Sequence, residues 1–401
     1  MPWKEESVMD QKEKFVIRSL DPEENFTQLC SEFGISTKTG YKWKERFIQG
    51  GRPALKELSR RPHKSPTRTD EDTICEIIKI RTKKPSWGSQ KILKVFLRNH
   101  PDNPNGISRS TVDRILDKAG LSIPKKKRRK PTGERLQKRI TPEAPNDVWT
   151  VDFKGWWYTS KKEKCEPLTV RDEYSKFIFS VKILEKGDIT CVKHEFEHLF
   201  AQYGLPKVIR SDNGPPFAHA FSMLGLTKLS AWWLYLGIHL DRIDPGKPYQ
   251  NGGHERMHKD IKRELQGKIN GPLSLHQAIF DQWREEFNTE RPHEALDFKC
   301  PADIYEPSKR RYRAEEYDYI YPPEYRTRKV NNRGWINFQQ ERYYISTTMM
   351  GFSVGVKWES ESELTVRLNN FDLGKIDLHT KLFEATLDKD QSIQNNTLPI
   401  S

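Results

Sequence analysis

The chain has 401 residues and a formal net charge of +13, from 69 basic and 56 acidic side chains. Residues 1–140 hold 33 of the basic and 18 of the acidic side chains, a balance of +15, so the remaining 261 residues are nearly neutral at −2. A strongly basic third joined to a near-neutral remainder predicts a polyanion-binding module attached to something else. The sequence contains no apolar run long enough to predict a membrane span. Its first residues lack the apolar segment of a signal peptide. The five cysteines are scattered and odd in number, as expected of reduced thiols in a cytosolic protein.

Residues from about 8 to 50 carry the pattern of a helix-turn-helix. Apolar side chains within residues 26–33 recur at helical spacing, Gly34 predicts a tight turn, and Trp43 and Phe47 share one face of a second helical stretch. The basic residues on the polar face of that stretch are Lys38, Lys42, Lys44 and Arg46. We predict that this basic face binds DNA; a small helical bundle with a solvated face is the alternative.

The same pattern recurs further along the chain. A helical stripe of apolar residues covers 87–98, and after a Pro/Asn/Gly loop a short helix starts near Ile107 and ends near Gly120. Arg109 and Arg114 would lie on the exposed side of that helix. Two such units in tandem support each other, so we predict that the second unit also contacts DNA, through these two arginines.

Two basic, proline-containing segments are interpreted as linkers. Arg60–Arg68 (RRPHKSPTR) would join the two helical units, and Lys125–Lys130 (KKKRRK) belongs to a basic linker over residues 123–144. The second run has three possible interpretations: a solvated, disordered stretch, a strap along DNA phosphates, or a nuclear localisation signal.

The residue pattern changes from about Asn146 onward. Val148–Phe153 predicts a buried strand, the polar turn Arg171–Ser175 predicts a hairpin, and Lys207–Arg210 predicts a short strand that runs into the sequence SDNG. Further expected elements are helices at 189–203, 229–236, 252–266 and 274–290, and a strand at 238–243. Strands followed by alternating helices and strands indicate a mixed α/β domain.

Beyond Pro301 the pattern turns to short strands separated by Gly, Asn or acidic turns. The expected strands are 343–345, 354–357, 364–368 and 375–378. Their regular spacing predicts a small β-barrel over residues 320–385.

Three acidic residues stand out by their position in the expected elements. Asp152 lies in the buried strand, Asp212 directly follows a strand, and Glu255 falls in the first turn of a helix. A carboxylate in a buried strand is unfavourable unless it is paired or bound to a cation. A single such aspartate is explained by a strand-end hydrogen bond, but three carboxylates at the edge of one core are better explained by a cation site. Mg²⁺ prefers oxygen ligands, and two such ions can hold the attacking and leaving oxygens of a phosphoryl displacement.

Four motifs surround these residues and cover about residues 145–300: VWTVDFKG, IRSDNGPPF, PGKPYQNGGHERMHKDIKREL and RPHEAL. Together they resemble the catalytic core of integrase-type DDE transposases, bacterial insertion-sequence enzymes related to retroviral integrases. The resemblance implies an RNase H-like fold, two Mg²⁺ or Mn²⁺ ions, and Asp152, Asp212 and Glu255 as the metal-binding catalytic triad. The interval of 43 residues between Asp212 and Glu255 is longer than usual in that superfamily, which predicts an enlarged loop or helix around residues 224–233.

Basic and amide side chains accompany the third carboxylate. Lys259 and Lys262 lie four and seven places after Glu255, on the same face of its helix. They would either hold DNA phosphates beside the metal ions or form salt bridges within the helix. Lys247, in the preceding loop, is a further candidate DNA contact, and Asn251 is a candidate cap of the helix.

Two other clusters are given structural interpretations. Cys191, His194 and His198 share a helical face at a spacing that mimics a zinc site, but no fourth ligand has suitable spacing, so we expect no zinc. The residues from Arg291 to His293 are expected to form a structural junction rather than a catalytic element.

The patterns predict a multidomain protein with tandem all-α helix-turn-helix modules, an α/β core and a small SH3-like C-terminal β-barrel. The resemblance implies that the core is RNase H-like and that the protein is a transposase. The expected boundaries are 1–58 and 69–122 for the two modules, 123–144 for the linker, 145–300 for the core and 320–385 for the barrel. The protein would bind the terminal inverted repeats of an insertion sequence in double-stranded DNA, cut one strand and join the freed 3′-hydroxyl to target DNA. It would act as a homo-oligomer on DNA in the bacterial cytoplasm, associated with the nucleoid and not with membranes. The alternatives are a domesticated or repressor-like DNA-binding protein, and a metal-dependent nuclease without joining activity.

Overall fold

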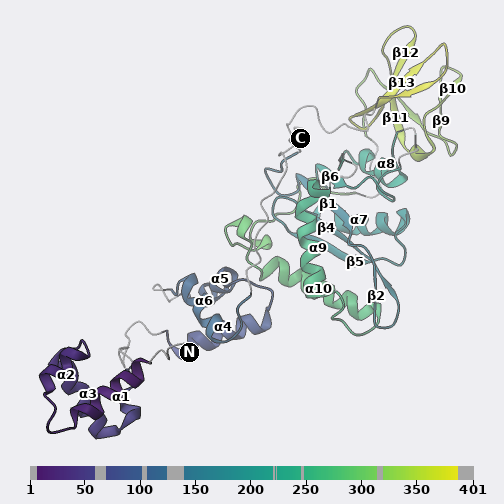
Figure 1. Ribbon diagram of the computed structural model, residues 1–401. Helices are drawn as coiled ribbons and strands as arrows, with labels where there is room; N and C mark the ends of the chain where they lie inside the picture. The colour runs from purple at the N-terminus through teal and green to yellow at the C-terminus, as the bar shows by residue number, and fades with distance from the viewer. Residues whose placement is uncertain are drawn as a thin grey trace, which may run out of the picture. The chain divides into compact units, whose positions relative to one another are not determined.

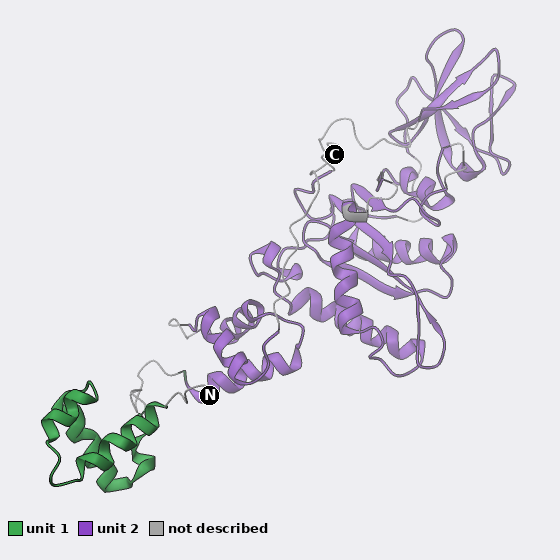
Figure 2. Ribbon diagram, in the orientation of Figure 1, with its two compact units in different colours: residues 1–69 green, residues 70–401 purple. Residues whose placement is uncertain are grey.

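The computed structural model describes residues 7–58, 69–101, 106–123, 140–219, 222, 224–244, 248–313 and 319–386. It divides into two compact units, Met1–Thr69 and Asp70–Ser401 (Figures 1 and 2). The predicted linker Arg60–Arg68, the run Lys125–Lys130 and Lys247 lie outside the described residues. Among the helices that are described, none is both long enough and apolar enough to cross a membrane.

The first unit is a small helical bundle. Its elements are α1 Val8–Ser19, α2 Phe26–Glu32, α3 Thr37–Gly50 and a 3₁₀ helix Arg52–Leu55. Each α-helix begins after a side chain that accepts a backbone N–H, and these caps are Ser7, Asn25 and Ser36. Gly40 lets α3 pass close to its neighbours, because a Cβ there would come within 2.6 Å of the Cys30 sulfur and 2.9 Å of the Phe15 ring. The helix-turn-helix predicted from the sequence corresponds to α2 and α3.

A second helical module opens the second unit. It consists of α4 Glu71–Lys83, α5 Ser89–Asn99 and α6 Arg109–Lys118. The buried apolar side chains of its core include Ile77, Trp87, Ile92, Phe96 and Val112. Arg81 is buried at the helix junction, where its guanidinium donates hydrogen bonds to the carbonyl oxygens of Trp87 and Leu121. The guanidinium of Arg81 therefore stabilises the interior of this module and adds no positive charge to its surface.

The α/β core is built on a five-stranded sheet in the order β5-β4-β1-β6-β7 (Figure 1). The strands are β1 Val148–Phe153, β4 Pro167–Asp172, β5 Ile178–Ile183, β6 Val208–Ser211 and β7 His239–Arg242. β1, β4 and β5 are antiparallel, whereas β6 and β7 run parallel to β1. A two-stranded hairpin, β2 Trp157–Tyr158 with β3 Lys164–Cys165, follows β1.

Helices cover both faces of this sheet. They are α7 Ile189–Tyr203, α8 Lys228–Tyr235, α9 Gly252–Glu264 and α10 Leu273–Thr289. Trp149 and Val151 of β1 belong to the apolar cluster that contains α7 and α8, while Ile178 and Val181 of β5 belong to the cluster that contains α9 and α10. α8 occupies most of the predicted insertion around 224–233. The predicted mixed α/β core is confirmed.

The C-terminal region is a second sheet, not the predicted closed barrel. Its strands are β8 Arg326–Lys329, β11 Ser353–Trp358, β12 Glu363–Leu368, β13 Phe371–Asp377 and β14 Phe383–Ala385, and β9 Trp335–Phe338 pairs separately with β10 Glu341–Tyr344. In the described part of the chain the order β14-β13-β12-β11-β8 leaves β14 and β8 as open edges. The reason lies in the edges, because β8 (RTRK) has no apolar side chain to bury in a closed barrel and β14 has three residues.

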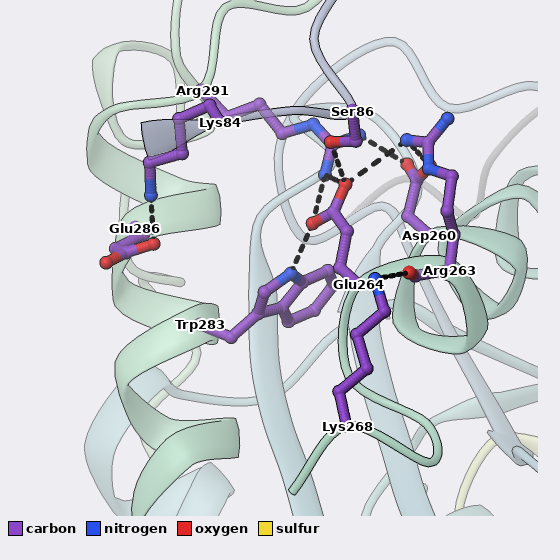
Figure 3. A network of polar contacts seen from close by, with 9 residues as sticks. All are labelled: Lys84, Ser86, Asp260, Arg263, Glu264, Lys268, Trp283, Glu286 and Arg291. Carbon is purple, nitrogen blue, oxygen red and sulfur yellow. Dashed lines mark hydrogen bonds and ion pairs between the residues drawn. The ribbon is translucent and has the colours of Figure 1, made fainter. Parts of the chain in front are cut away.

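A buried ion-pair network joins the second helical module to the core (Figure 3). Arg291 contacts Asp260 at 2.7 Å and Glu264 at 3.3 Å, and Ser86 of the module donates to Glu264 at 2.6 Å. Burial alone would raise the pKa of Glu264, but Arg291 and the hydrogen bonds from Ser86 and Trp283 bring it below its usual value. This arrangement supports the predicted structural role of the 291–293 segment.

The network yields a stability prediction with a matched control. Arg291 is 4% exposed, so Arg291→Gln removes the buried counterion of Asp260 and Glu264 and should lower the free energy of unfolding by about 3 kcal/mol. Arg263 contacts the same two acids at 2.8 and 3.2 Å, but its side chain is 48% exposed. Arg263→Gln should therefore lower the free energy of unfolding by less than about 1 kcal/mol. Denaturant unfolding followed by tryptophan fluorescence measures both; equal effects would contradict the structural role of Arg291.

Candidate active site

Two of the candidate carboxylates lie at the ends of neighbouring parallel strands. Thr150 of β1 lies opposite Arg210 of β6 in parallel register. Continued by two residues, this register brings Asp212, which directly follows β6, beside Asp152 near the end of β1. The carboxyl ends of parallel strands share one edge of a sheet, and that edge is where α/β folds bind ligands.

Two histidines on the inner face of α9 fix that helix, and with it Glu255, against the sheet. His254 is fully buried, with Nδ1 2.8 Å from the Thr150 hydroxyl and Nε2 2.6 Å from the Thr169 hydroxyl. One turn later, Nε2 of His258 lies 2.8 Å from the same Thr169 oxygen. Helix α9 is therefore tied to β1 and β4 by hydrogen bonds as well as by apolar packing.

We call the hydrogen-bonded group of His254, His258, Thr150 and Thr169 the histidine seam. Counting its hydrogen-bond donors shows which atoms carry the protons. The Thr169 hydroxyl donates its one proton to the carbonyl oxygen of Asp152 at 2.8 Å, so its oxygen accepts from Nε2–H of both histidines. Nδ1 of His254 then accepts from the Thr150 hydroxyl, and Nδ1 of His258 carries no proton. That nitrogen lies 3.8 Å from Oδ2 of Asp152. The contact is not an ion pair, because burial and nearby cations lower the pKa of His258 to about 3.

The carboxylates at this edge carry more negative charge than their surroundings offset. Burial above all, together with the charges of Asp212 and Glu255, raises the pKa of Asp152 to about 7, although the charge of Lys154 opposes this shift. Burial also raises the pKa of Asp212. Burial and the charge of Lys262 lower the pKa of Lys154, so this cation is itself destabilised. An added cation would stabilise this arrangement.

The three carboxylates interact electrostatically but are not already arranged as the ligands of one ion. In the ranges that the structure describes, no group of three His, Cys, Asp or Glu side chains is placed to hold a metal. The Glu255 carboxylate lies 3.6 Å from the Lys259 ammonium, the intrahelical salt bridge that the sequence allowed. The oxygen donors and excess charge of Asp152 and Asp212 fit a hard cation, and Glu255 would have to leave Lys259 to join them.

Known protein families match this chain in two regions. Two models of an integrase core domain match residues 142–248 and 236–301, a helix-turn-helix model matches 11–63, and a homeodomain-like model matches 39–116. The chain therefore contains an integrase core domain. Its helix-turn-helix region precedes the integrase core.

Two relatives come from insertion elements. A protein of insertion element IS407 from Burkholderia multivorans is 28% identical over 193 residues, which are 48% of this chain and 66% of the relative. A protein of insertion element IS476 from Xanthomonas euvesicatoria is 29% identical over 51% of this chain and 57% of the relative. The chain thus spans less than two thirds of either relative. The solved HTLV-2 integrase catalytic core domain is 20% identical and covers 41% of this chain and 100% of its own, with a TM-score of 0.33.

The predicted DNA contacts of the helical modules lie on two helices. Lys38 and Lys42 are exposed on α3, and Arg46 is half-buried there. Arg109 and Arg114 are exposed on α6.

Several features of the site were not predicted from the sequence. His254, His258 and Thr169 form the seam described above, and their only signal was the four-residue spacing of the histidines on one helical face. Asn251 takes the N-cap position of α9, but its side chain makes no capping hydrogen bond, which contradicts the expected role of that side chain. Its backbone φ of −110° and ψ of 32° lies outside the extended conformation of an ordinary side-chain cap.

The raised pKa of Asp152 predicts that this carboxylate destabilises the metal-free fold. Its pKa of about 7 lies above that of an unfolded aspartate, so folding favours the protonated form and stability falls as the pH rises toward 7. In EDTA at pH 8, Asp152→Asn should raise the thermal midpoint by a few degrees, and the gain should shrink as the pH falls toward 5. Asp281→Asn, at an exposed position on α10, should change the midpoint little at either pH. Thermal unfolding measures both; a loss of stability in Asp152→Asn at pH 8 would contradict this account.

Proposed function

We propose that this protein is the transposase of an insertion element. It binds the terminal inverted repeats of the element, cuts one DNA strand at each end and joins the freed 3′-hydroxyl to target DNA. The observation that carries this proposal is the parallel register that brings Asp152 beside Asp212 at the sheet edge of an integrase core, with the helix of Glu255 hydrogen-bonded to the same sheet. The basic helix-turn-helix region upstream supports it, because such regions bind duplex DNA.

The three carboxylates Asp152, Asp212 and Glu255 would hold two divalent cations, Mg²⁺ or Mn²⁺. Such ions supply the Lewis acid that activates an attacking hydroxyl and stabilises the leaving oxygen in phosphoryl transfer. The chain's own contribution is position: the paired strand ends hold both aspartates, and the histidine seam orients the helix of Glu255. Lys154 and Lys262 would hold DNA phosphates beside the carboxylates.

The helical modules would supply the recognition of DNA ends. In a helix-turn-helix, the second helix enters the major groove, where its side chains read base edges, while backbone contacts fix the register. We assign this role to α3, with Lys38, Lys42 and Arg46, and to α6, with Arg109 and Arg114. Lys247, Lys259 and Lys262 belong to the DNA surface of the core in this proposal, and Lys259 changes partner from Glu255 to phosphate on binding. The active form would be a homo-oligomer that holds two element ends, in the bacterial cytoplasm at the nucleoid.

A repressor-like DNA-binding protein and a nuclease without joining activity are the competing functions. A protein that only binds DNA gains nothing from three coupled carboxylates, of which one destabilises the metal-free fold. A nuclease would use the same carboxylates, so only the products of the reaction separate it from a transposase.

Amide substitutions test the catalytic assignment. Asp152→Asn, Asp212→Asn and Glu255→Gln remove ligand charge while they keep side-chain volume, so each should lower joining of labelled element-end DNA to plasmid by about 100-fold or more. Joining should require Mg²⁺ or Mn²⁺ and stop in excess EDTA. Binding of end DNA in Ca²⁺ should stay near wild type, and the matched control Asp281→Asn should join normally.

The three functions give different products in this assay. Joined plasmid supports the transposase, nicked end DNA without joining indicates a nuclease, and a gel shift without any cleavage indicates a DNA-binding protein. Wild-type joining by any one of the three variants would remove that residue from the triad.

A further inference from the structure

The β2–β3 hairpin presents two large aromatic side chains to solvent. Trp157 pairs with Cys165 across the hairpin, and both are buried, 8% and 0% exposed. Because strand side chains alternate between faces, the neighbours Trp156 and Tyr158 point outward, and they are 57% and 62% exposed. Their ring centroids lie 5.4 Å apart at an interplanar angle of 66°.

The hairpin is held against the helix that carries Glu255. Trp157 and Cys165 share an apolar cluster with Met257 and Ile261 of α9. The backbone of the turn is also fixed, since the N–H of Thr159 donates to the carbonyl of Glu163 at 2.9 Å. The exposed aromatic pair is therefore a fixed feature of the core, and its first member lies four residues after Asp152 in the sequence.

Basic side chains flank the aromatic pair. Lys161 and Lys162 lie in the turn and are exposed, and Lys164 lies on β3 with its ammonium 5.9 Å from the Trp156 ring. Lys164 also forms an exposed ion pair with Glu166 at 2.6 Å, which a stronger anion can displace. Sites for single-stranded nucleic acid combine exposed aromatic rings with basic side chains. The bases stack on the rings, and the phosphates form ion pairs with the cations.

We propose that Trp156 and Tyr158 form a stacking platform for an unpaired nucleotide of DNA next to the carboxylate edge. This inference rests on the proposed function, because that function brings a DNA end to this edge. An unpaired nucleotide fits better than an intact duplex, since paired and stacked bases offer no free face to a ring. It also fits better than a second copy of the chain, because a two-fold contact through this hairpin would bring the same lysines of both copies together.

Binding measurements without chemistry test the platform. In EDTA, the full-length protein is titrated against a labelled duplex oligonucleotide with a short oligo-dT tail, and against the same duplex with blunt ends. Trp156→Ala and Tyr158→Ala should each weaken binding of the tailed duplex by about 5- to 100-fold and leave the blunt duplex within about 2-fold. Trp156→Phe keeps a stacking ring and should retain most of the affinity.

The matched control is Trp358→Ala, which removes a 40% exposed tryptophan from the C-terminal sheet. It should leave both affinities unchanged. Unchanged binding of the tailed duplex by Trp156→Ala, or an equal loss for both duplexes, would overturn the platform. A loss of self-association in Trp156→Ala, with unchanged binding of the tailed duplex, would assign the aromatic pair to a contact between copies instead. Because no step here needs cleavage, a wild-type protein that binds the tailed duplex selectively but never joins DNA would refute the proposed function and leave the platform standing.

Discussion

Repulsion between partly buried carboxylates at the ends of β1 and β6 is the constraint on which this integrase core depends. The parallel register of the two strands brings Asp152 and Asp212 together, and their partial burial raises the pKa of both carboxyl groups. Two apolar clusters pack on the two faces of the same sheet, and their burial favours the folded state despite this local repulsion. Such local cost is typical of sites that are arranged for a ligand rather than for stability.

One helix connects this edge to the rest of the second unit. α9 carries Glu255 in its first turn, and His254 next to it is buried against the sheet. Further along, Met257 packs against the β2–β3 hairpin, and Glu264 accepts a hydrogen bond from Ser86 of the second helical module. A displacement of α9 would therefore change its contacts with the carboxylate edge, the β2–β3 hairpin and the second helical module together.

Local patterns predicted the parts that depend on local sequence. Periodicity located the main helices and strands of the core. Asp152 was singled out by its position within a buried strand, and Asp212 by its position directly after a strand. The prediction of a C-terminal barrel was not confirmed. Short strands indicate which segments pair, but barrel closure depends on whether two distant edge strands, here β8 and β14, meet. The histidine seam was missed for a related reason. The many polar residues of the α9 sequence suggested that His254 faces solvent. Its burial follows from contacts with Thr150 and Thr169, which lie far away in the sequence.

Cation binding by the carboxylate edge is the most direct test of the account. Isothermal titration of Mn²⁺ into the full-length protein should show saturable binding at pH 8 that weakens as the pH falls through 7, because protons compete for Asp152. Asp152→Asn and Asp212→Asn should each abolish that binding, while Asp281→Asn should leave it intact. Mn²⁺ binding that is absent from the wild-type protein, or that is unchanged in both strand-end variants, would contradict the assignment of this edge as a metal site.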